Sequence, residues 1–305
     1  MNSKFKNKYL AALVCAVLGV VVLGVVFVLP FIFDTFYGDK IITQTLNNVT
    51  GNLTDPDQIA LSIMAWEKEY FYNPYALFDP NSTFQKFGVY EINGTHKKFY
   101  RNAPVSWIIY SRLANCEEYA KTFVYLMNKE GVEARIVSAP AEDHTWAEYY
   151  FNGYKIVVDP SANKVISDKK EFAKGKNWSY IESVNIFNNS DKKDVSEEYF
   201  ERGKLTVRVT NQNKPVNRAN VIVKSLYLAE INPNMYKKPK VVFTNTTNKD
   251  GKAVFYLGEK QYVVKIEYCF KAYSKNVTVV PNKEVDLNFN LTLSKLKFLF
   301  CSLIF

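Results

Sequence analysis

Twenty-five residues in a row, from Tyr9 to Phe33, carry no charge, and this run constrains the chain more than any other feature of its sequence. As a helix the run is long enough to cross the hydrocarbon core of a bilayer, which is about 30 Å thick. Lysines precede the run and aspartates follow it, at Lys4, Lys6, Lys8, Asp34 and Asp39. The positive-inside rule then leaves residues 1–8 in the cytoplasm, and the missing small-x-small cleavage site favours an uncleaved signal anchor over 9–33. A buried soluble helix is the alternative.

Everything beyond Phe33 is therefore predicted to face outward, in a single-pass protein of the cell membrane. Sequons mark surface acceptor sites in exported glycoproteins, although an Asn-rich chain also produces some by chance. Nine N-x-[ST] sequons lie beyond the apolar run, at Asn48, Asn52, Asn81, Asn93, Asn177, Asn188, Asn245, Asn276 and Asn290. The formal net charge of +9 suits either anionic envelope polymers and lipid headgroups or a simple lysine-rich surface. Nucleic acid is not an expected partner outside a cell.

One cysteine lies at the predicted start of a helix. Asn115 is a favourable N-cap, Glu118 stands three residues later as in a capping box, and Gly131 is a suitable stop. Between them apolar residues recur at helical spacing, at Ala120, Phe123, Val124 and Met127. The backbone N–H groups of a first turn favour a thiolate at Cys116 and can donate to an oxyanion, although the carboxylates of Glu117 and Glu118 oppose the thiolate. A buried structural cysteine is the alternative.

A histidine and an aspartate lie on one predicted β-hairpin. Residues 144–151 alternate as a strand, Asn152-Gly153 is a strong signal for a two-residue type I′ turn, and residues 154–159 form the returning strand. Counting outward from the turn makes His144 a diagonal neighbour of Asp159, about 7–8 Å away at Cα and within side-chain hydrogen-bond reach. With a cysteine upstream, this pair predicts a nucleophile, a general base and the group that orients the base. The alternative is a surface histidine beside a strand-end aspartate.

The segments that contain these residues resemble the transglutaminase-like superfamily, over about residues 55–165. The core motifs of that family are C-x-[DE]-[FY]-A, H-x-W-x-E and D-P-[ST]. This chain matches them with Cys116, Glu118, Tyr119 and Ala120, with His144, Trp146 and Glu148, and with Asp159, Pro160 and Ser161. It departs from the family at Ala114, where glycine is usual, and at Glu117, which replaces the tryptophan of the animal cross-linking enzymes. The second departure disfavours protein cross-linking and favours the prokaryotic branch, which resembles thiol proteases and amidases.

This resemblance implies a papain-like core that acts on amide bonds without a metal or organic cofactor, through a catalytic triad of Cys116, His144 and Asp159. It also implies an upstream donor to the oxyanion, for which Tyr110 and Trp107 are the candidates, and a place for Trp146 in the substrate cleft. The expected function is that of a cysteine protease or amidase acting on envelope or surface polypeptides. Two other functions stay open, a non-catalytic surface adhesin or scaffold and a cross-linking transglutaminase.

The segments that precede and follow the motifs differ in composition. Residues 34–54 are predicted to form a stalk, and 55–165 the catalytic core, which opens with a helix capped by Asp55 and begun by Pro56. Residues 166–203, rich in Lys, Asn and Asp, are interpreted as a peripheral extension and linker.

From residue 204 to 292 the pattern changes to that of a β-sandwich. Apolar residues alternate at Leu205, Val207, Val209, Val221, Val223, Val254, Tyr256, Val264, Ile266, Val277 and Val279. Three segments, 215–221, 247–252 and 261–264, resemble a carboxypeptidase-regulatory-like or related immunoglobulin-like domain. Residues 293–305 form an apolar tail that is too short to span a bilayer and that either touches the membrane interface or forms a terminal strand.

The four cysteines fall in four different segments, at Cys15, Cys116, Cys269 and Cys301. This distribution predicts neither a disulfide framework nor a zinc cluster. The predicted fold class is α+β, with a papain-like transglutaminase core after an N-terminal transmembrane helix, followed by an all-β sandwich domain.

Overall fold

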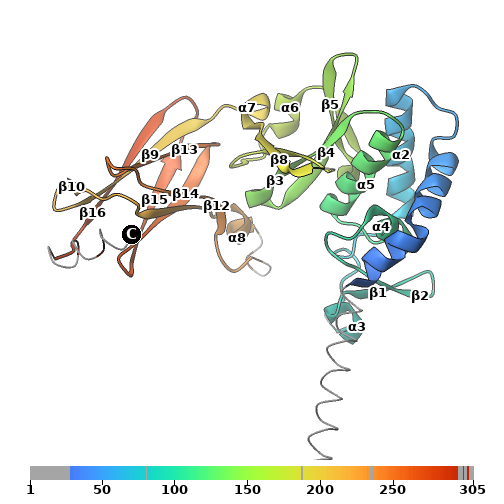
Figure 1. The fold of residues 1–305 in the computed structure, drawn as a ribbon, viewed down its shortest axis with the longest axis horizontal. Coiled ribbons are helices and arrows are strands. Elements are labelled where there is room, and N and C mark those ends of the chain that lie inside the picture. Colours follow the sequence, from blue (N-terminus) through green and yellow to red (C-terminus); the bar gives the residue numbers. More distant parts are fainter. Residues whose placement is uncertain are drawn as a thin grey trace, which may run out of the picture. The chain divides into compact units, whose positions relative to one another are not determined.

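The structure is a computed structural model that describes residues 28–79, 81–186, 188–231, 233, 236–294, 298 and 301. These residues form two compact units (Figure 1). The first unit holds the described residues up to Val132 together with Pro160–Asn163, and the second holds Glu133–Asp159 and the described residues from Lys164 onward. The boundary between Asp159 and Pro160 therefore cuts the third sequence motif.

The first unit is mainly helical. Its described elements are a helix over 28–49, α2 (Pro56–Tyr70), α3 (Thr83–Lys86), β1 (Val89–Ile92), β2 (Thr95–Lys98), α4 (Val105–Ser111), α5 (Cys116–Lys129) and the 3-10 helix η2 (Pro160–Ala162). β1 and β2 pair as an antiparallel hairpin, and η2 packs on both α2 and α5. The last turn of α5 ends as predicted at Gly131, whose φ of 79° permits the closing bond from Val132 N to Met127 O.

Most of the predicted anchor, residues 9–27, lies outside the described residues. Among the residues that the structure does describe, no helix combines the length and the apolar character needed to cross a membrane. Residues 34–49, predicted as a stalk, belong to the helix over 28–49. That helix is attached to the rest of the first unit, because Asp34 Oδ1 accepts a hydrogen bond of 2.5 Å from Ser106 Oγ. Thr50 Oγ1, just beyond the helix, donates to Glu130 Oε1 at 2.7 Å.

A buried carboxyl group in α2 has no apparent compensation. Glu67 has no solvent exposure, and neither of its carboxyl oxygens has a hydrogen-bond partner among the described residues. Burial raises the pKa of Glu67 well above its ordinary value of 4.5. Between 4.5 and this raised pKa the folded protein holds a proton that the unfolded chain has lost, so the stability falls as the pH rises above 4.5.

We therefore expect Glu67→Met to raise the free energy of unfolding at pH 7 by about 1–3 kcal/mol, because it removes an unpaired buried polar group. The pH dependence above 4.5 should also become flatter. Urea unfolding of the full chain at pH 5 and pH 8 measures both effects. Glu69→Met, at an exposed position of the same helix, is the control. A Glu67→Met protein that is less stable than the parent at pH 8 would contradict the expectation.

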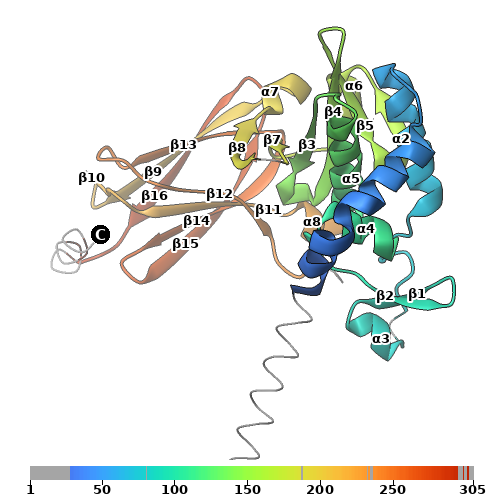
Figure 2. The ribbon, with the colours of Figure 1, turned by 45° about the vertical axis from the view of Figure 1, so that its right-hand side comes forward.

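The second unit contains a six-stranded antiparallel sheet in the order β6-β5-β4-β3-β7-β8 (Figure 2). Its elements are β3 (Ala134–Ala139), η1 (Pro140–Glu142), β4 (His144–Phe151), β5 (Tyr154–Asp159), β6 (Lys164–Ile166), α6 (Lys169–Ala173), β7 (Glu182–Asn185), β8 (Asn188–Asp194) and α7 (Ser196–Tyr199). Residues 166–203, interpreted from sequence as a peripheral linker, thus supply two strands and two helices that pack with this sheet. Apolar residues in that segment, Phe172, Trp178, Ile181 and Tyr199, are buried with Trp146.

The remainder of the second unit consists of two four-stranded sheets around one hydrophobic core. Its elements are β9 (Gly203–Asn211), β10 (Lys214–Pro215), β11 (Asn220–Ser225), α8 (Tyr227–Ile231), β12 (Lys240–Thr246), β13 (Lys252–Leu257), β14 (Lys260–Tyr268), β15 (Lys271–Val279) and β16 (Glu284–Leu291). One sheet has the order β12-β11-β14-β15, and in the other β9 pairs antiparallel with β10 and β13 and parallel with β16. Alternate residues of β9, β11 and β14 are buried, as expected for strands with one face on a core.

The predicted core is wrong by one residue in β13. Val254 and Tyr256 are 39% and 50% exposed, and Ala253, Phe255 and Leu257 are buried in their place. Because side chains alternate along a strand, an offset of one residue moves every side chain to the opposite face. Every residue from Lys252 to Leu257 except the lysine is apolar, so the sequence offers no contrast that distinguishes the two faces.

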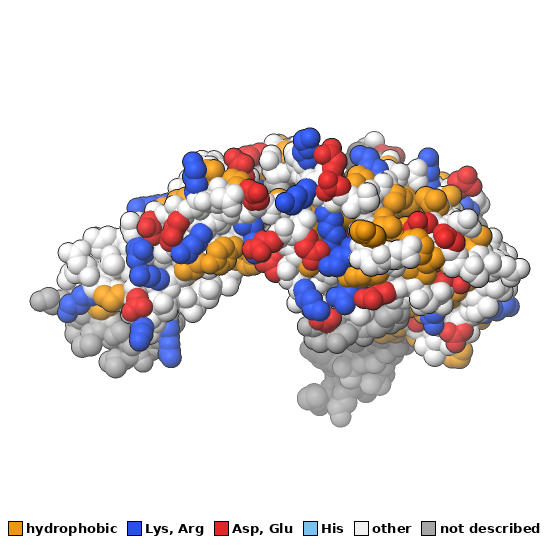
Figure 3. Space-filling view, turned by 90° about the horizontal axis from the view of Figure 1, so that it is seen from above, with side chains coloured by type: hydrophobic (Ala, Val, Ile, Leu, Met, Phe, Trp, Pro, Cys, Tyr) orange, Lys and Arg blue, Asp and Glu red, His pale blue; other side chains and the backbone are white. Residues whose placement is uncertain are grey.

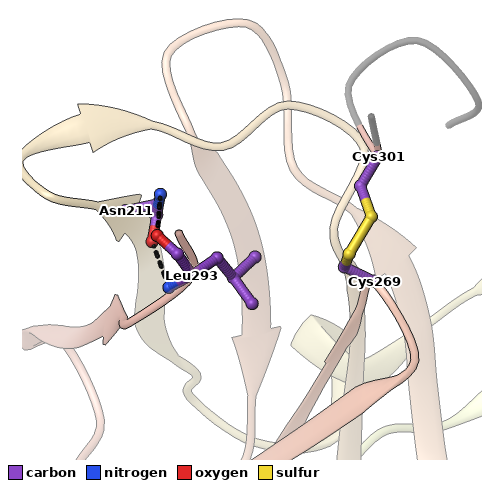
Figure 4. Close-up of a disulfide and its surroundings, with 4 residues drawn as sticks. All are labelled: Asn211, Cys269, Leu293 and Cys301. Atoms are coloured by element: carbon purple, nitrogen blue, oxygen red, sulfur yellow. Dashed lines mark hydrogen bonds between the residues drawn. A yellow bond between two sulfur atoms is a disulfide. The ribbon is translucent and has the colours of Figure 1, made fainter. Parts of the chain in front are cut away.

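The prediction that the cysteines form no disulfide is also wrong. Cys269 and Cys301 are bonded, with their Cα atoms 5.6 Å apart and 32 residues apart in sequence (Figure 4). Nearby, the Asn211 side chain fixes the chain after β16, since its Oδ1 accepts from Leu293 N at 2.8 Å and its Nδ2 donates to Leu293 O at 3.3 Å. Most of the apolar tail, from 295 to 305, lies outside the described residues, apart from Phe298 and Cys301.

We expect Cys301→Ser to destabilise the sandwich by about 3–4 kcal/mol, because the bond closes a loop of 32 residues and so restricts the unfolded chain. Hydrogen exchange of the β14 and β15 amides in the full chain reports this loss directly. Cys15→Ser is the matched control, since it also removes one thiol. If the β14 amides exchange at equal rates in both variants, the disulfide contributes no stability.

Charged side chains of both signs are interleaved on the face drawn in Figure 3. The described residues also form ion pairs, among them Lys155 with Glu198, Arg202 with Asp194 and Glu197, and Arg208 with Asp286. The positive net charge therefore does not form a continuous basic field on this face.

Candidate active site

Cys116 is the first residue of α5, in the first unit. The predicted capping box is present: the Asn115 side chain accepts from the backbone N–H groups of Glu117 and Glu118, at 2.9 and 3.4 Å, and Glu118 Oε2 accepts from Asn115 N at 3.1 Å. The Cys116 side chain is half-buried and is not part of a disulfide. The cap holds the sulfur in the first turn of a helix of 14 residues, at the positive end of the helix dipole.

Glu118, two residues after the cysteine, is itself perturbed. Burial raises the pKa of Glu118 to about 7, against the opposing effect of the hydrogen bond from Asn115. Below pH 7 the carboxyl group is therefore mainly neutral and does not repel a thiolate at Cys116. Above pH 7 it is charged, and the repulsion expected from the sequence begins to act.

We expect Cys116 in the Glu118→Gln variant to be alkylated roughly two- to fivefold faster than in the parent at pH 8, because one nearby negative charge is removed. At pH 6 the parent carboxyl is already neutral, so the two proteins should react at equal rates. Stopped-flow or mass-spectrometric alkylation at both pH values tests this, with circular dichroism as the check that the helix keeps its cap. Equal rates at pH 8 would mean that Glu118 does not influence the sulfur.

His144 and Asp159 form a hydrogen-bonded pair in the second unit, as the register predicted. Asn152 and Gly153 both have positive φ, β4 pairs with β5 from Phe151 opposite Tyr154 outward, and the count brings the two side chains together. His144 Nε2 lies 2.8 Å from Asp159 Oδ2. The Asp159 carboxylate is buried, and the imidazole is about one quarter exposed. Because an ionised carboxylate only accepts, the pair places the imidazole proton on Nε2 and the basic lone pair on Nδ1.

Two indole rings lie behind the imidazole. The His144 ring is 5.7 Å from the Trp146 ring at an interplanar angle of 28°, and 6.3 Å from the Trp178 ring at 25°. Trp146 and Trp178 stack on each other at 4.6 Å and 10°. The Lys176 ammonium lies 5.1 Å from the Trp178 ring. Burial lowers the pKa of Lys176, and the charge of Asp159 opposes this effect.

Trp146 is held in turn by a buried polar network. Its Nε1–H donates to Tyr199 Oη at 3.0 Å, and the Tyr199 hydroxyl donates to Glu148 Oε1. Lys169 Nζ donates to the same Glu148 oxygen at 2.6 Å. Burial and the neighbouring Glu148 charge raise the pKa of Tyr199 well above its usual range, so the hydroxyl stays a donor. Glu148 thus holds Trp146 through Tyr199, and the Trp146 ring in turn packs beside the His144 imidazole.

The turn that precedes His144 contacts the sandwich. Glu142, at the end of η1, is buried and accepts from Lys260 Nζ of β14 and from Ser179 Oγ, both at 2.6 Å. Gly258 lies against the main chain of Trp178: a Cβ at this position would come within 2.0 Å of Trp178 O, which excludes any other residue there. The sandwich therefore supports two residues close to the histidine: Glu142, which precedes it by two residues, and Trp178, whose ring stacks beside the imidazole.

The structure also places the other three site residues predicted from sequence. Trp146 has no exposed surface, so it does not line an open cleft. Trp107 Nε1–H already donates to Lys98 O at 3.2 Å, and an indole has no second donor for an oxyanion. The Tyr110 ring lies 4.7 Å from the Phe33 ring, with Lys97 Nζ 3.6 Å from its centre. Among the described residues Tyr110 thus packs with Phe33 and Lys97, and its part in the site stays a prediction.

Four residues of the segment 166–203 that pack or bond around the histidine and Trp146 were not predicted from the sequence: Lys169, Lys176, Trp178 and Tyr199. The available signal was the presence of large aromatic residues at Phe172, Trp178 and Tyr199 inside an otherwise polar segment. Such residues are seldom left in solvent. Within the part of the chain that the structure describes, no three His, Cys, Asp or Glu side chains are placed to hold a metal ion.

Comparisons with known proteins agree with the motif assignment. The sequence model of the transglutaminase-like superfamily matches residues 43–160. The chain is similar to the peptide-N(4)-(N-acetyl-beta-glucosaminyl)asparagine amidase of Drosophila melanogaster, with 34% identity over 109 residues, or 35% of this chain and 17% of that protein. The amidase of the same name from Eremothecium gossypii is 33% identical over 101 residues, or 32% of this chain and 28% of that protein.

This chain therefore spans less than a third of the length of either relative. Among solved structures, Rad4–Rad23 bound to a 6-4 photoproduct UV lesion has a TM-score of 0.34 and 13% identity, over 57% of this chain and 46% of that chain. So low a score supports no inference. Residues 43–160 match the transglutaminase-like superfamily, and the helix and hairpin context of the motifs agrees with this match.

Proposed function

We propose that this protein is a membrane-anchored thiol hydrolase that cleaves amide bonds outside the cytoplasm, with Cys116 as nucleophile, His144 as general base and Asp159 as the group that orients the base. The observation that supports it best is the His144–Asp159 pair, with its distance of 2.8 Å and its buried carboxylate. A buried carboxylate is costly unless it is compensated, and here the imidazole provides the compensation. The second support is the position of Cys116 at a capped helix start.

The chain itself connects the two parts of the proposed triad. Asp159 is the last residue of β5, and Pro160, bonded to it, belongs to η2. η2 is part of the first unit and packs on α5, the helix that begins with Cys116. The third motif thus joins β5, which ends with the carboxylate, to η2. η2 in turn packs on α5, the helix that begins with the thiol.

In the proposed reaction His144 Nδ1 takes the proton of Cys116 Sγ, and the thiolate attacks the carbonyl carbon of the amide. The tetrahedral oxyanion accepts from the backbone N–H of Cys116. The imidazolium then protonates the amide nitrogen, the C–N bond breaks, and an amine leaves a thioester on Cys116. Water, deprotonated by His144, attacks the thioester and releases the acid and the thiol. Asp159 holds the imidazole in the required tautomer throughout.

The proposed substrates are envelope or surface polypeptides. The two relatives are named as amidases of glycosylated asparagine, and a side-chain amide of this kind is the second substrate class we would test. Both classes use the same acyl-transfer chemistry and differ in whether the acyl group belongs to the main chain or to an Asn side chain.

The proposed location is the outer side of the cell membrane, with residues 9–33 as the anchor. The Cys269–Cys301 disulfide favours an oxidising compartment. The eight sequon asparagines whose side chains are described, all except Asn188, are exposed, as glycan acceptors must be.

Labelling by an electrophilic amide-mimic probe tests the proposal. The full chain in detergent should acquire one probe molecule, and peptide mapping should place it on Cys116. Prior alkylation of Cys116 should prevent the labelling, and unfolding in urea should abolish it. Adding a primary amine to a substrate digest separates hydrolysis from transfer, because only a transferase gives an amide product. Labelling that persists in urea would be ordinary thiol chemistry and would contradict the proposal.

A further inference from the structure

We propose that one surface of the first unit binds the headgroup layer of the membrane beside the anchor, so that the unit lies on the bilayer; this rests on the proposed anchor. The surface is formed by α3, by the β1–β2 hairpin with the segment before it, and by the beginning of the helix over 28–49. We call it the interfacial surface, and its exposed apolar residues are Phe36, Tyr37, Leu77, Phe78, Phe84 and Phe87. Their exposed fractions range from 39% to 75%, and so many large exposed apolar side chains in two short segments often mark an interaction surface.

The surface is continuous with the end of the apolar run. Phe33, the last uncharged residue of that run, packs against Trp107 at 5.3 Å and Tyr110 at 4.7 Å between ring centres. Lys97 Nζ of β2 lies 3.6 Å from the centre of the same Tyr110 ring. Trp107 Nε1 donates to Lys98 O. If Phe33 lies at the outer boundary of the hydrocarbon core, these contacts place Lys97 and Lys98 at the level of the headgroups.

The two exposed phenylalanines of α3 and its end, Phe84 and Phe87, contact the hairpin strand that carries those lysines. Lys98 Nζ donates to Phe87 O, and the Phe84 ring lies 5.3 Å from the His96 ring of β2. Both ribbon views place α3, β1 and β2 at the same end of the first unit as the start of the helix over 28–49 (Figures 1 and 2). The aromatic residues of α3 are therefore held beside the lysines, and these beside the place where the apolar run ends.

The chemistry of this surface fits a lipid interface better than a protein groove. Aromatic rings concentrate at membrane–water boundaries, and basic side chains near them attract anionic lipids. Residues 73–104 carry four cations, Lys86, Lys97, Lys98 and Arg101, and two carboxylates, Asp79 and Glu91. The beginning of the helix over 28–49 adds Lys40, Asp39 and Asp34, of which Asp34 bonds to Ser106, so the excess of cations lies in α3, the hairpin and the segment after it. The apolar residues are spread over the helix over 28–49, the loop before α3, α3 itself and the residue that follows it.

An environment-sensitive dye on single cysteines tests this proposal. The full chain, with Cys15→Ser and Cys116→Ser and the disulfide intact, is labelled at Phe84→Cys or Phe87→Cys and reconstituted into phosphatidylcholine vesicles with and without phosphatidylglycerol. Leu61→Cys on α2 is the control, since Leu61 is 56% exposed and belongs to the same unit. We expect blue-shifted emission at 84 and 87, and quenching by nitroxide-labelled lipid several times stronger than at 61. Phosphatidylglycerol should increase the difference.

The other outcomes distinguish failure of the interfacial surface from failure of the anchor. If the chain stays with the vesicles in alkaline carbonate but positions 84 and 87 behave like position 61, the anchor stands and the interfacial surface is wrong. If the emission at 84 and 87 shifts only when a polypeptide substrate is added, the surface binds protein and not lipid. If alkaline carbonate extracts the chain, the proposed anchor fails and the interfacial surface fails with it, whereas probe labelling of Cys116 remains a separate test of the chemistry.

Discussion

Cys116→Ala is expected to lower the turnover of an amide substrate by a factor on the order of 10⁴ or more, because no other group can form the thioester. The change removes one sulfur atom from a half-buried site and leaves the Asn115–Glu118 cap intact. The thermal unfolding temperature should therefore stay close to that of the parent. Single-turnover assays with a peptide or glycopeptide substrate measure the loss.

Cys15→Ala is the matched control, since it removes a thiol that lies outside the proposed site. Its turnover should equal that of the parent. A Cys116→Ala protein that keeps a tenth of the parental turnover would mean that Cys116 is structural, which is the alternative that its position alone left open.

Asp159→Asn is expected to lower kcat by about 10⁴, with a much smaller change in KM. The amide has nearly the shape of the carboxylate, but its NH₂ group can donate to His144 Nε2. The imidazole then carries its proton on Nδ1, the nitrogen that must act as the base. The loss should be largest near neutral pH, where the tautomer of the neutral imidazole decides the activity. A pH profile of kcat and KM for parent and variant measures both effects.

The control for this change is Asp143→Asn, one residue before the histidine. Asp143 pairs with Lys240 at 3.3 Å and accepts from the Tyr236 hydroxyl, so its carboxylate is used away from the imidazole. Asp143→Asn should keep at least most of the parental kcat. If Asp143→Asn and Asp159→Asn lose equal activity, the effect is one of local folding and not of the His144 tautomer.

The parts of the site that the sequence predicted are those set by short-range chemistry. A two-residue turn with positive φ at Asn152 and Gly153 determines the register of the hairpin, and the register determines that His144 meets Asp159. The start of α5 follows in the same way from Asn115 and Glu118, which bond only within their own turn. Such signals need no knowledge of the rest of the chain.

The parts that were missed depend on residues far apart in sequence. Trp178 lies 32 residues after Trp146 and stacks on it, but nothing in the segment 166–203 indicates a partner that far away. The same holds for the bond between Cys269 and Cys301, because pairing depends on where two strand ends meet. In β13 the error has another cause, since an almost wholly apolar strand contains no periodic contrast.

The buried Glu142–Lys260 pair limits how far the protein chain can be shortened from its C-terminal side. A chain that ends before the sandwich keeps all three motifs but loses Lys260. Glu142, two residues before His144, would then keep the hydrogen bond from Ser179 but lose the cation that balances its charge. Trp178 would lose the backing of Gly258 at the same time. Proteolytic cleavage or domain exchange near residue 203 would therefore remove contacts that hold Glu142 and Trp178 beside His144, although all three motifs stay intact. The sandwich is in this sense a part of the second unit that cannot be exchanged as an independent domain.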